Sequence, residues 1–138
     1  VRSRGVIMRE TQAKGCYGAY SVWHRATLDR SNFSQCGFRE AEFTGASLRG
    51  VNFKSAKLWA VNFTNADLAG ARFDDASLQY GATFRGADLT DATFAGTDLS
   101  EVDFSGVKSI AGADFSGATR VEQAVGLFEA NGADDAEW

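Results

Sequence analysis

The sequence predicts an all-β solenoid, a stack of short repeated units. Large apolar residues recur at every fifth position over most of the chain, a period that matches neither the roughly 3.6 residues of a helical turn nor the two of a strand. Ten of the eleven phenylalanines occupy this one position. Short periods of this kind indicate repeats that bury their apolar side only against their neighbours.

The register of large residues runs from Leu28 to Phe115 with two slips. The step of five holds without a miss as far as Leu78, and one extra residue, most simply Gly81, then shifts the frame. A second slip falls in the stretch 107–114. The predicted core residues are Leu28, Phe33, Phe38, Phe43, Leu48, Phe53, Leu58, Phe63, Leu68, Phe73, Leu78, Phe84, Leu89, Phe94, Leu99, Phe104 and Phe115.

Each unit is expected to turn two residues inward, because alternate residues of an extended stretch share a face. The second inward residue lies two places before the large one and is small, for example Ala41, Ala66 or Ala87. A narrow interior cannot hold two bulky side chains per unit. The outward positions are mostly Asn, Asp, Ser, Thr, Arg, Gly and Ala, and glycine at the end of a unit suits a tight corner.

The stretches "ADLAG", "ARFDD", "ADLTD" and "ADFSG" resemble the pentapeptide-repeat family, whose motif is A(D/N)LXX. The resemblance covers residues 26–119 and implies a right-handed quadrilateral β-helix with four units, about twenty residues, per coil. Residues twenty apart should then stack, and the leucines at 28, 48, 68 and 89 do recur with this spacing once Gly81 is discounted. We therefore expect about four and a half coils.

The two ends of the stack are predicted to be capped, because an uncovered edge invites further strands. Residues 1–25 form an N-terminal segment and cap, with Trp23 as the floor of the first coil and no visible repeat in residues 1–15. Spacing of Val121, Ala124, Val125 and Phe128 predicts an amphipathic capping helix over 120–131. An acidic tail, 132–138, follows, and its terminal tryptophan is expected to pack back or to bind a partner.

The two cysteines, Cys16 and Cys36, are separated by one coil of twenty residues. If the repeat reaches back to Cys16, both lie at the inward small position, at a distance compatible with a disulfide. Alternatively, Cys36 is a small buried residue and Cys16 belongs to the cap. Both alternatives remain open at the level of the sequence.

No enzymatic activity, metal or cofactor is expected. Two cysteines without a histidine cluster do not make a zinc site, and the single histidine, His24, is predicted to lie on the surface near the N-terminal cap. A filled coil offers no cleft for a general base, and no nucleotide-binding motif is present. The chain has no apolar run of about 18 residues, so no membrane span is predicted, and no direct contact with nucleic acid is expected.

Charge and exposed aromatic residues point to protein binding. Residues 1–69 hold ten Lys and Arg against five Asp and Glu, whereas residues 70–138 hold four against thirteen. In a rod this split becomes an electrical dipole along the axis. The dipole either steers a binding partner or reflects sequence drift at outward positions where the fold sets no constraint. Trp59 and Tyr80 are predicted to project from one face beside Lys57 and Arg39, and these four form the candidate interface.

The predicted function is therefore that of a non-enzymatic protein-binding scaffold or assembly module, a monomer or weak dimer that uses the flat outer faces of the rod. The resemblance implies an alternative, since some pentapeptide-repeat proteins mimic DNA, bind DNA gyrase and confer quinolone resistance. Such mimicry needs an acidic rod, whereas the first half of this chain is basic. A regulatory protein of cyanobacteria or plastids is a third role found in the family.

Overall fold

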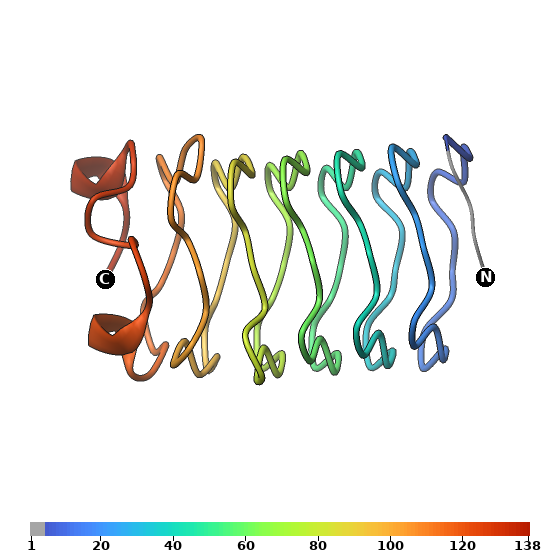
Figure 1. The fold of residues 1–138 in the computed structure, drawn as a ribbon, viewed down its shortest axis with the longest axis horizontal. Helices are drawn as coiled ribbons and strands as arrows, with labels where there is room; N and C mark the ends of the chain where they lie inside the picture. The colour runs from blue at the N-terminus through green and yellow to red at the C-terminus, as the bar shows by residue number, and fades with distance from the viewer. Residues whose placement is uncertain (1–4) are drawn as a thin grey trace.

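The computed structural model describes residues 5–138, which form a straight four-sided rod of stacked coils. The first described coil (blue) and the last coil (red) lie at opposite ends of the rod (Figure 1). Parallel β-bridges join each coil to the next, from Ile7–Thr27 to Asp114–Glu137. The predicted all-β solenoid is confirmed. Its bridged region corresponds to about six coils, more than the four and a half expected.

Inside the rod, each side of a coil is held to both neighbouring coils through one bridged residue. Ser47, for example, lies between the buried residues Ala46 and Leu48. Its N–H donates to the carbonyl of Ala26 in the preceding coil (2.8 Å), while the N–H of Leu48 donates to the carbonyl of Asp67 in the next (2.7 Å). Because the chain turns a corner every fifth residue, the bridges stay isolated and no longer strand is present in residues 5–138.

Asparagine and aspartate recur in the repeat because their side chains close the corners. The Oδ1 atom of Asn62 accepts the N–H of Thr64 (2.9 Å), and Oδ1 of Asp103 accepts that of Ser105 (2.8 Å). These local bonds satisfy backbone donors that the ladder does not reach. The corner that follows Thr64 is completed by Asn65 in the left-handed conformation, with φ of 57°.

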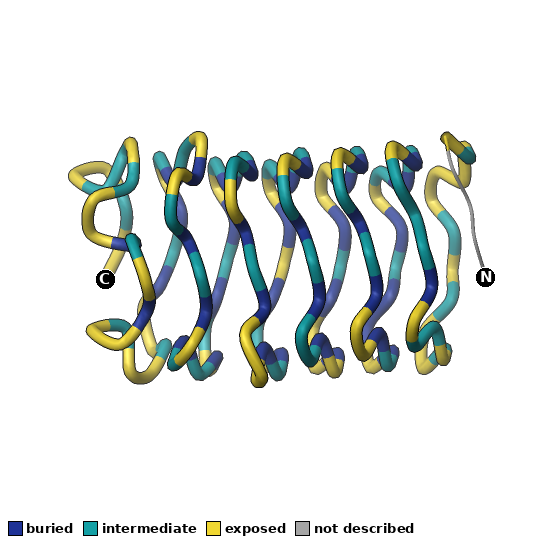
Figure 2. The backbone as a smooth tube through the Cα atoms, in the orientation of Figure 1, coloured by how far each residue is buried: buried dark blue, intermediate teal, exposed yellow. Residues whose placement is uncertain are grey.

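The core consists of columns of stacked side chains along the axis of the rod, and every predicted core residue is buried. Figure 2 shows that buried positions recur in coil after coil. In two columns, aromatic rings from successive coils stack with centroids 4.9 to 6.3 Å apart. One column is Trp23, Phe43, Phe63, Phe84 and Phe104; the other is Phe33, Phe53, Phe73, Phe94, Phe115 and Trp138. Trp23 therefore begins one column, as the floor predicted for it, and Trp138 ends the other.

The extra residue near position 81 is accommodated at a corner without disturbing the core. Bridges are spaced by twenty residues up to Lys57–Ser77 and by twenty-one at Asn62–Thr83. Gly81 has a φ of 78°, which favours glycine, and no atom lies within 4 Å of the position a Cβ would take. The insertion therefore bulges into solvent beside Tyr80.

The coil starts earlier than the boundary predicted at residue 26. Ile7, Gln12, Tyr17 and Val22 each bridge to the residue twenty positions further on. The repeat is not visible in this part of the sequence because small residues take two of its large inward positions, at 13 and 18. Residues 1–4 of the predicted N-terminal segment lie outside the described part of the chain.

The capping helix predicted over 120–131 is wrong. Two single-turn 3-10 helices are present instead, η1 (Val121–Gln123) and η2 (Ala133–Asp135), and Val125 between them is bridged to Asp103. The N–H of Val125 donates to Val102 (2.9 Å), and its carbonyl accepts the N–H of Phe104 (2.8 Å). A helix would leave these backbone groups of the preceding coil unpaired, so this segment extends the ladder of β-bridges instead.

The predicted acidic tail belongs to the last coil. Glu137 bridges to Asp114, and Trp138 packs back onto the end of the core. Figure 1 shows both short helices at the red end of the rod. None of the helices in residues 5–138 has the length and apolar character needed to cross a bilayer.

Candidate protein-binding face

The predicted neighbours Trp59 and Tyr80 contact one another on the outside of the rod. Their ring centroids are 5.7 Å apart and their planes stand at 79°, an edge-to-face arrangement. The two residues belong to successive coils, which are joined here by the bond from the N–H of Ala60 to the carbonyl of Gln79 (2.9 Å). The side chain of Tyr80 is 68% exposed, whereas Trp59 is half-buried.

The indole of Trp59 is held in a fixed orientation. Its Nε1–H donates to the hydroxyl of Ser77 at 2.8 Å, and the ammonium of Lys57 lies 6.0 Å from the ring centroid. A side chain that is already ordered loses less conformational entropy when a partner covers it. The indole of Trp59 is therefore preorganised.

A shallow hollow of about 310 Å³ lies against this pair, lined by Trp59, Tyr80, Ala60, Arg39 and Glu40. The stacked corner positions here are Glu40, Ala60 and Tyr80, and the short side chain of Ala60 leaves the depression between its two larger neighbours. On the rim, Nε–H of Arg39 donates to Oε1 of Glu40 (3.1 Å). The hollow thus combines an apolar floor with a charged rim.

Two further tyrosines, which the sequence-based prediction missed, extend this surface. Tyr17 is 84% exposed and Tyr20 is 58% exposed, and the guanidinium of Arg39 lies 6.0 Å from the ring centroid of Tyr20. The bridges Tyr17–Gly37, Gly37–Lys57 and Lys57–Ser77 align their segments on one side of the rod. We call the side made of residues 16–20, 36–40, 56–60 and 76–80 the aromatic face.

A signal for these residues was available in the sequence. All three tyrosines of the chain fall within this face, and Tyr20 and Tyr80 lie sixty residues, or three coils, apart. The apolar repeat, from which outward positions are predicted, is lost before Trp23, where Ala13 and Gly18 take the large inward positions.

The fold and its repeat now identify the family. The family model described as "Pentapeptide repeat region" matches residues 19–104, more than half of the chain. The chain belongs to the pentapeptide-repeat family. No curated protein matches the sequence.

Several solved structures are similar to this pentapeptide-repeat chain. A trypsin-treated form of QnrB1, a plasmid-mediated fluoroquinolone resistance protein, is 23% identical, with a TM-score of 0.64 over 85% of this chain and 70% of that one. Rfr23 of the cyanobacterium Cyanothece is 18% identical, with a TM-score of 0.48 over 86% of this chain and 90% of that one. A pentapeptide repeat protein of the Arabidopsis thaliana thylakoid lumen is 26% identical, with a TM-score of 0.37 over 89% of this chain and 88% of that one. The likeness to QnrB1 shows the shared right-handed quadrilateral β-helix.

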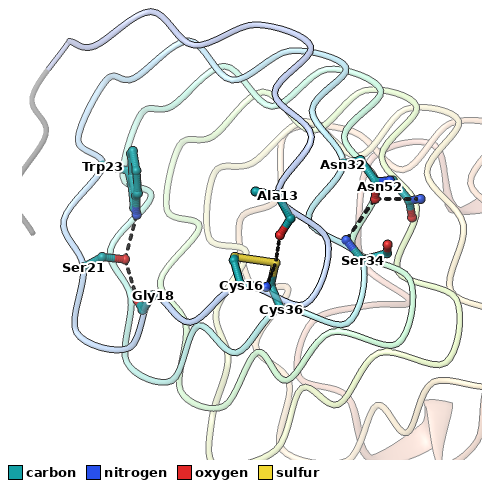
Figure 3. Close-up of a disulfide and its surroundings, with 9 residues drawn as sticks. All are labelled: Ala13, Cys16, Gly18, Ser21, Trp23, Asn32, Ser34, Cys36 and Asn52. Atoms are coloured by element: carbon teal, nitrogen blue, oxygen red, sulfur yellow. Dashed lines mark hydrogen bonds between the residues drawn. A yellow bond between two sulfur atoms is a disulfide. The ribbon is translucent and has the colours of Figure 1, made fainter.

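The two cysteines lie at the beginning of the aromatic face, on its first two coils. The structure joins Cys16 and Cys36 by a disulfide, with their Cα atoms 4.5 Å apart (Figure 3). This distance follows from the stacking of residues twenty apart in a pentapeptide-repeat coil. The pair therefore ties the segment that carries Tyr17 and Tyr20 to the segment that carries Arg39.

The remaining candidate, His24, lies on an adjacent side of the coil. Its side chain is half-exposed, and Nε2 is 3.9 Å from Oε2 of Glu42. Within residues 5–138, no group of three or more His, Cys, Asp and Glu side chains is placed to hold a metal ion.

Several carboxylates in the acidic half of the rod are used in the corners of the pentapeptide-repeat coil. Burial raises the pKa of the Asp98 carboxyl, but hydrogen bonds from Ser100 and the nearby guanidinium of Arg120 outweigh it and hold the pKa below its usual range. In Asp114, hydrogen bonds from the hydroxyl and backbone of Ser116 lower the pKa and outweigh a smaller opposing effect of burial. These carboxylates stay charged and have structural roles.

Proposed function

We propose that this protein is a non-enzymatic binding module and that a partner protein docks on its aromatic face. The observation that carries the proposal is the edge-to-face pair of Trp59 and Tyr80 beside a hollow with Arg39 on its rim. Tryptophan, tyrosine and arginine are the residues that most often dominate the binding energy of protein interfaces.

The chemistry of the face indicates what the partner presents. The hollow of about 310 Å³ admits an apolar side chain against Trp59 and Ala60. The charged residues of the aromatic face are Arg39, Lys57 and Glu40, and Glu40 already accepts a hydrogen bond from Arg39. We therefore expect the partner to offer an apolar side chain flanked by carboxylates, which would pair with Arg39 and Lys57.

The coil supports this role because it holds the face rigid. The backbone of every segment in the face is hydrogen-bonded to a neighbouring coil, for example through the bond from the N–H of Glu40 to the carbonyl of Trp59 (2.8 Å). A face that does not rearrange can bind nearly as a rigid body. Because the backbone of this face need not rearrange, an interface of a given area can bind more tightly.

A DNA-mimicking rod that binds DNA gyrase is the alternative. The net charge of −9 over residues 70–138 supports it, and the opposite charge of the first half counts against it. In that case the acidic half would carry the affinity, and the aromatic face would contribute little.

The test begins with capture of binding proteins by the wild type and by the double variant Trp59→Ala/Tyr80→Ala. Binding kinetics of each captured protein, and of gyrase, are then measured by surface plasmon resonance. Trp59→Ala should raise the off-rate by about thirtyfold, equivalent to roughly 2 kcal/mol. Arg85→Ala, which removes an exposed cation from another side of the rod, is the matched control for Arg39→Ala.

The two proposed functions predict that different substitutions weaken binding. A partner of the aromatic face should respond to Trp59→Ala and Arg39→Ala and be indifferent to Arg85→Ala. A complex whose kinetics are unchanged by Trp59→Ala would contradict the proposal, and dependence on the acidic half alone would favour the gyrase alternative.

A further inference from the structure

We propose that the disulfide between Cys16 and Cys36 controls the aromatic face: the oxidised pair holds Tyr17 and Tyr20 on the rod, and its reduction to two thiols releases them. This regulation rests on the proposed protein-binding function where it concerns affinity. The structural part, release of the first segment, stands independently of any partner.

The segment of residues 16–20 lacks the core contact that anchors its counterparts in later coils. Elsewhere on this side of the rod each coil buries a small and a large inward residue, such as Ala56 and Leu58. The first coil has Cys16 and Gly18 at these positions. A Cβ on Gly18 would lie 2.6 Å from Cε1 of Phe38, so the ring of the next coil occupies the space. The disulfide thus supplies an attachment to the next coil for a segment that has no large side chain of its own in the core.

The remaining bonds from this segment to another coil are few, and all of them reach the same neighbouring coil. The N–H groups of Gly18 and Tyr20 donate to the carbonyls of Gly37 and Arg39, each at 2.8 Å, and the carbonyl of Cys16 accepts the N–H of Gly37 (2.9 Å). Within residues 5–138 no coil lies on the other side of the segment. Local opening is easiest where few buried apolar contacts accompany exposed backbone hydrogen bonds.

The disulfide is open to a reductant from one side. Cys16 is half-buried, whereas Cys36 is fully buried, so a dithiol attacks the sulfur of Cys16. The attacking thiolate forms a mixed disulfide with Cys16, and Cys36 leaves as a thiolate that takes up a proton. The second thiol of the reductant then displaces Cys16. Two electrons and two protons pass to the protein, and the dithiol becomes a disulfide.

The reduced state has hydrogen-bond partners in place for Cys36. Its sulfur lies 2.8 Å from the carbonyl oxygen of Ala13 and 3.1 Å from the backbone nitrogen of Cys16 (Figure 3). Ser31 occupies the equivalent position one side earlier. Its hydroxyl donates to the carbonyl of Met8 (3.0 Å) and accepts the N–H of Thr11 (3.1 Å). A Cys36 thiol can donate to the carbonyl of Ala13 in the same way, and it therefore keeps a hydrogen-bond partner when residues 16–20 open.

Release of the first segment alters the surface that a partner meets. With the disulfide closed, Tyr20 lies beside Arg39, whose guanidinium is 6.0 Å from the ring. When residues 16–20 open, this contact is lost and the aromatic face is shortened to Arg39, Trp59 and Tyr80.

Hydrogen exchange on the full chain tests the structural part without a partner. Amide exchange of the segments 16–20 and 56–60 is compared before and after treatment with dithiothreitol. The amides of Gly18 and Tyr20 should exchange about tenfold faster after reduction, while segment 56–60 is unchanged. The chain has only two cysteines, so the dithiol has no other disulfide to act on. Unchanged exchange in segment 16–20 would overturn the proposal.

A serine variant and a binding measurement complete the test. Cys16→Ser/Cys36→Ser should exchange like the reduced protein and show no response to dithiothreitol. For a complex that depends on Trp59, reduction should weaken binding as much as Tyr17→Ala/Tyr20→Ala does, and should add nothing in that variant. Equal affinity of the oxidised and reduced proteins would overturn the control of the face. A complex that ignores Trp59 overturns the proposed function instead, and the exchange result distinguishes the two failures.

Discussion

The indole of Trp138 stacks on the ring of Phe115, with centroids 5.2 Å apart and planes inclined by 14°. It continues the column of rings that begins at Phe33, and Phe128 stacks against it at 4.9 Å. Trp138 thus covers the end of this column of the core.

Trp138→Ala should lower the free energy of unfolding by about 1–2 kcal/mol, because a half-exposed aromatic residue and its stacking contact are lost. Tyr17→Ala, at the most exposed aromatic side chain, should change it by about 0.5 kcal/mol or less. Denaturant midpoints measure both. Equal effects of the two substitutions would show that Trp138 does not cap the core.

Phe63→Ala, in the middle of the stack, should destabilise the protein by about 3–5 kcal/mol, as truncation of a fully buried phenylalanine does. Thr64→Ala, one position further along and pointing outward, should cost roughly 0.5 kcal/mol or less. Urea unfolding monitored by circular dichroism is the measurement, and similar costs at the two positions would contradict the inward and outward assignment.

Gly18→Ala should destabilise the first coil by about 1–3 kcal/mol, because the added methyl group meets the ring of Phe38. Gly37→Ala is the control, since its Cβ would lie 3.5 Å from Cδ2 of Tyr17, an ordinary contact. Hydrogen exchange in residues 16–20 reads the effect locally. Faster exchange in Gly37→Ala than in Gly18→Ala would be incompatible with the packing described.

Acid should weaken the rod partly through Asp114, whose pKa is lowered in the folded state by the hydrogen bonds from Ser116. In the unfolded chain the pKa of this carboxyl has its ordinary value of about 4, so the unfolded state binds more protons in acid. The stabilisation is therefore present above about pH 4 and is lost as pH falls through the folded pKa. Asp114→Asn keeps an acceptor for Ser116 but does not titrate. Its stability, from urea unfolding between about pH 7 and 2, should fall less steeply with acid than that of the wild type.

If a partner faces the acidic half, neutralising Asp74, Asp75, Asp88 and Asp91 should change the association rate more than the dissociation rate. The on-rate would fall and its dependence on salt would flatten, because long-range attraction is screened by ions. Association rates at two salt concentrations measure this. A change confined to the off-rate would instead place these residues within the contact surface.

Much of the fold could be predicted from the sequence because each unit repeats the same constraint. Phe63 and Ala66 are large and small for the same reason as their counterparts in every other unit, namely the width of the coil. The first coil could not be predicted, since Ala13 and Gly18 break the apolar pattern while the backbone pairing continues. At the other end, the spacing of Val125 and Phe128 matched a helix, but unpaired backbone groups of the coil below required a bridge.

The candidate site could be predicted in part. Counting twenty residues places Tyr80 over Ala60, the chain neighbour of Trp59, since stacking depends only on coil length. The bond from Trp59 to Ser77 and the hollow over Ala60 depend on side-chain rotamers, which a repeat pattern does not specify. Tyr20 was missed because it lies in the coil whose apolar repeat is absent.

The three tryptophans of the chain occupy the first, a middle and the last coil. Since chain position is axial position in this rod, each indole samples a different height along it (Figure 1). Fluorescence of variants that retain one indole each would therefore report local melting at Trp23, Trp59 and Trp138 separately. A rod that unfolds from its ends would lose the signals of Trp23 and Trp138 before that of Trp59. The three indoles are therefore built-in reporters of local unfolding along the rod.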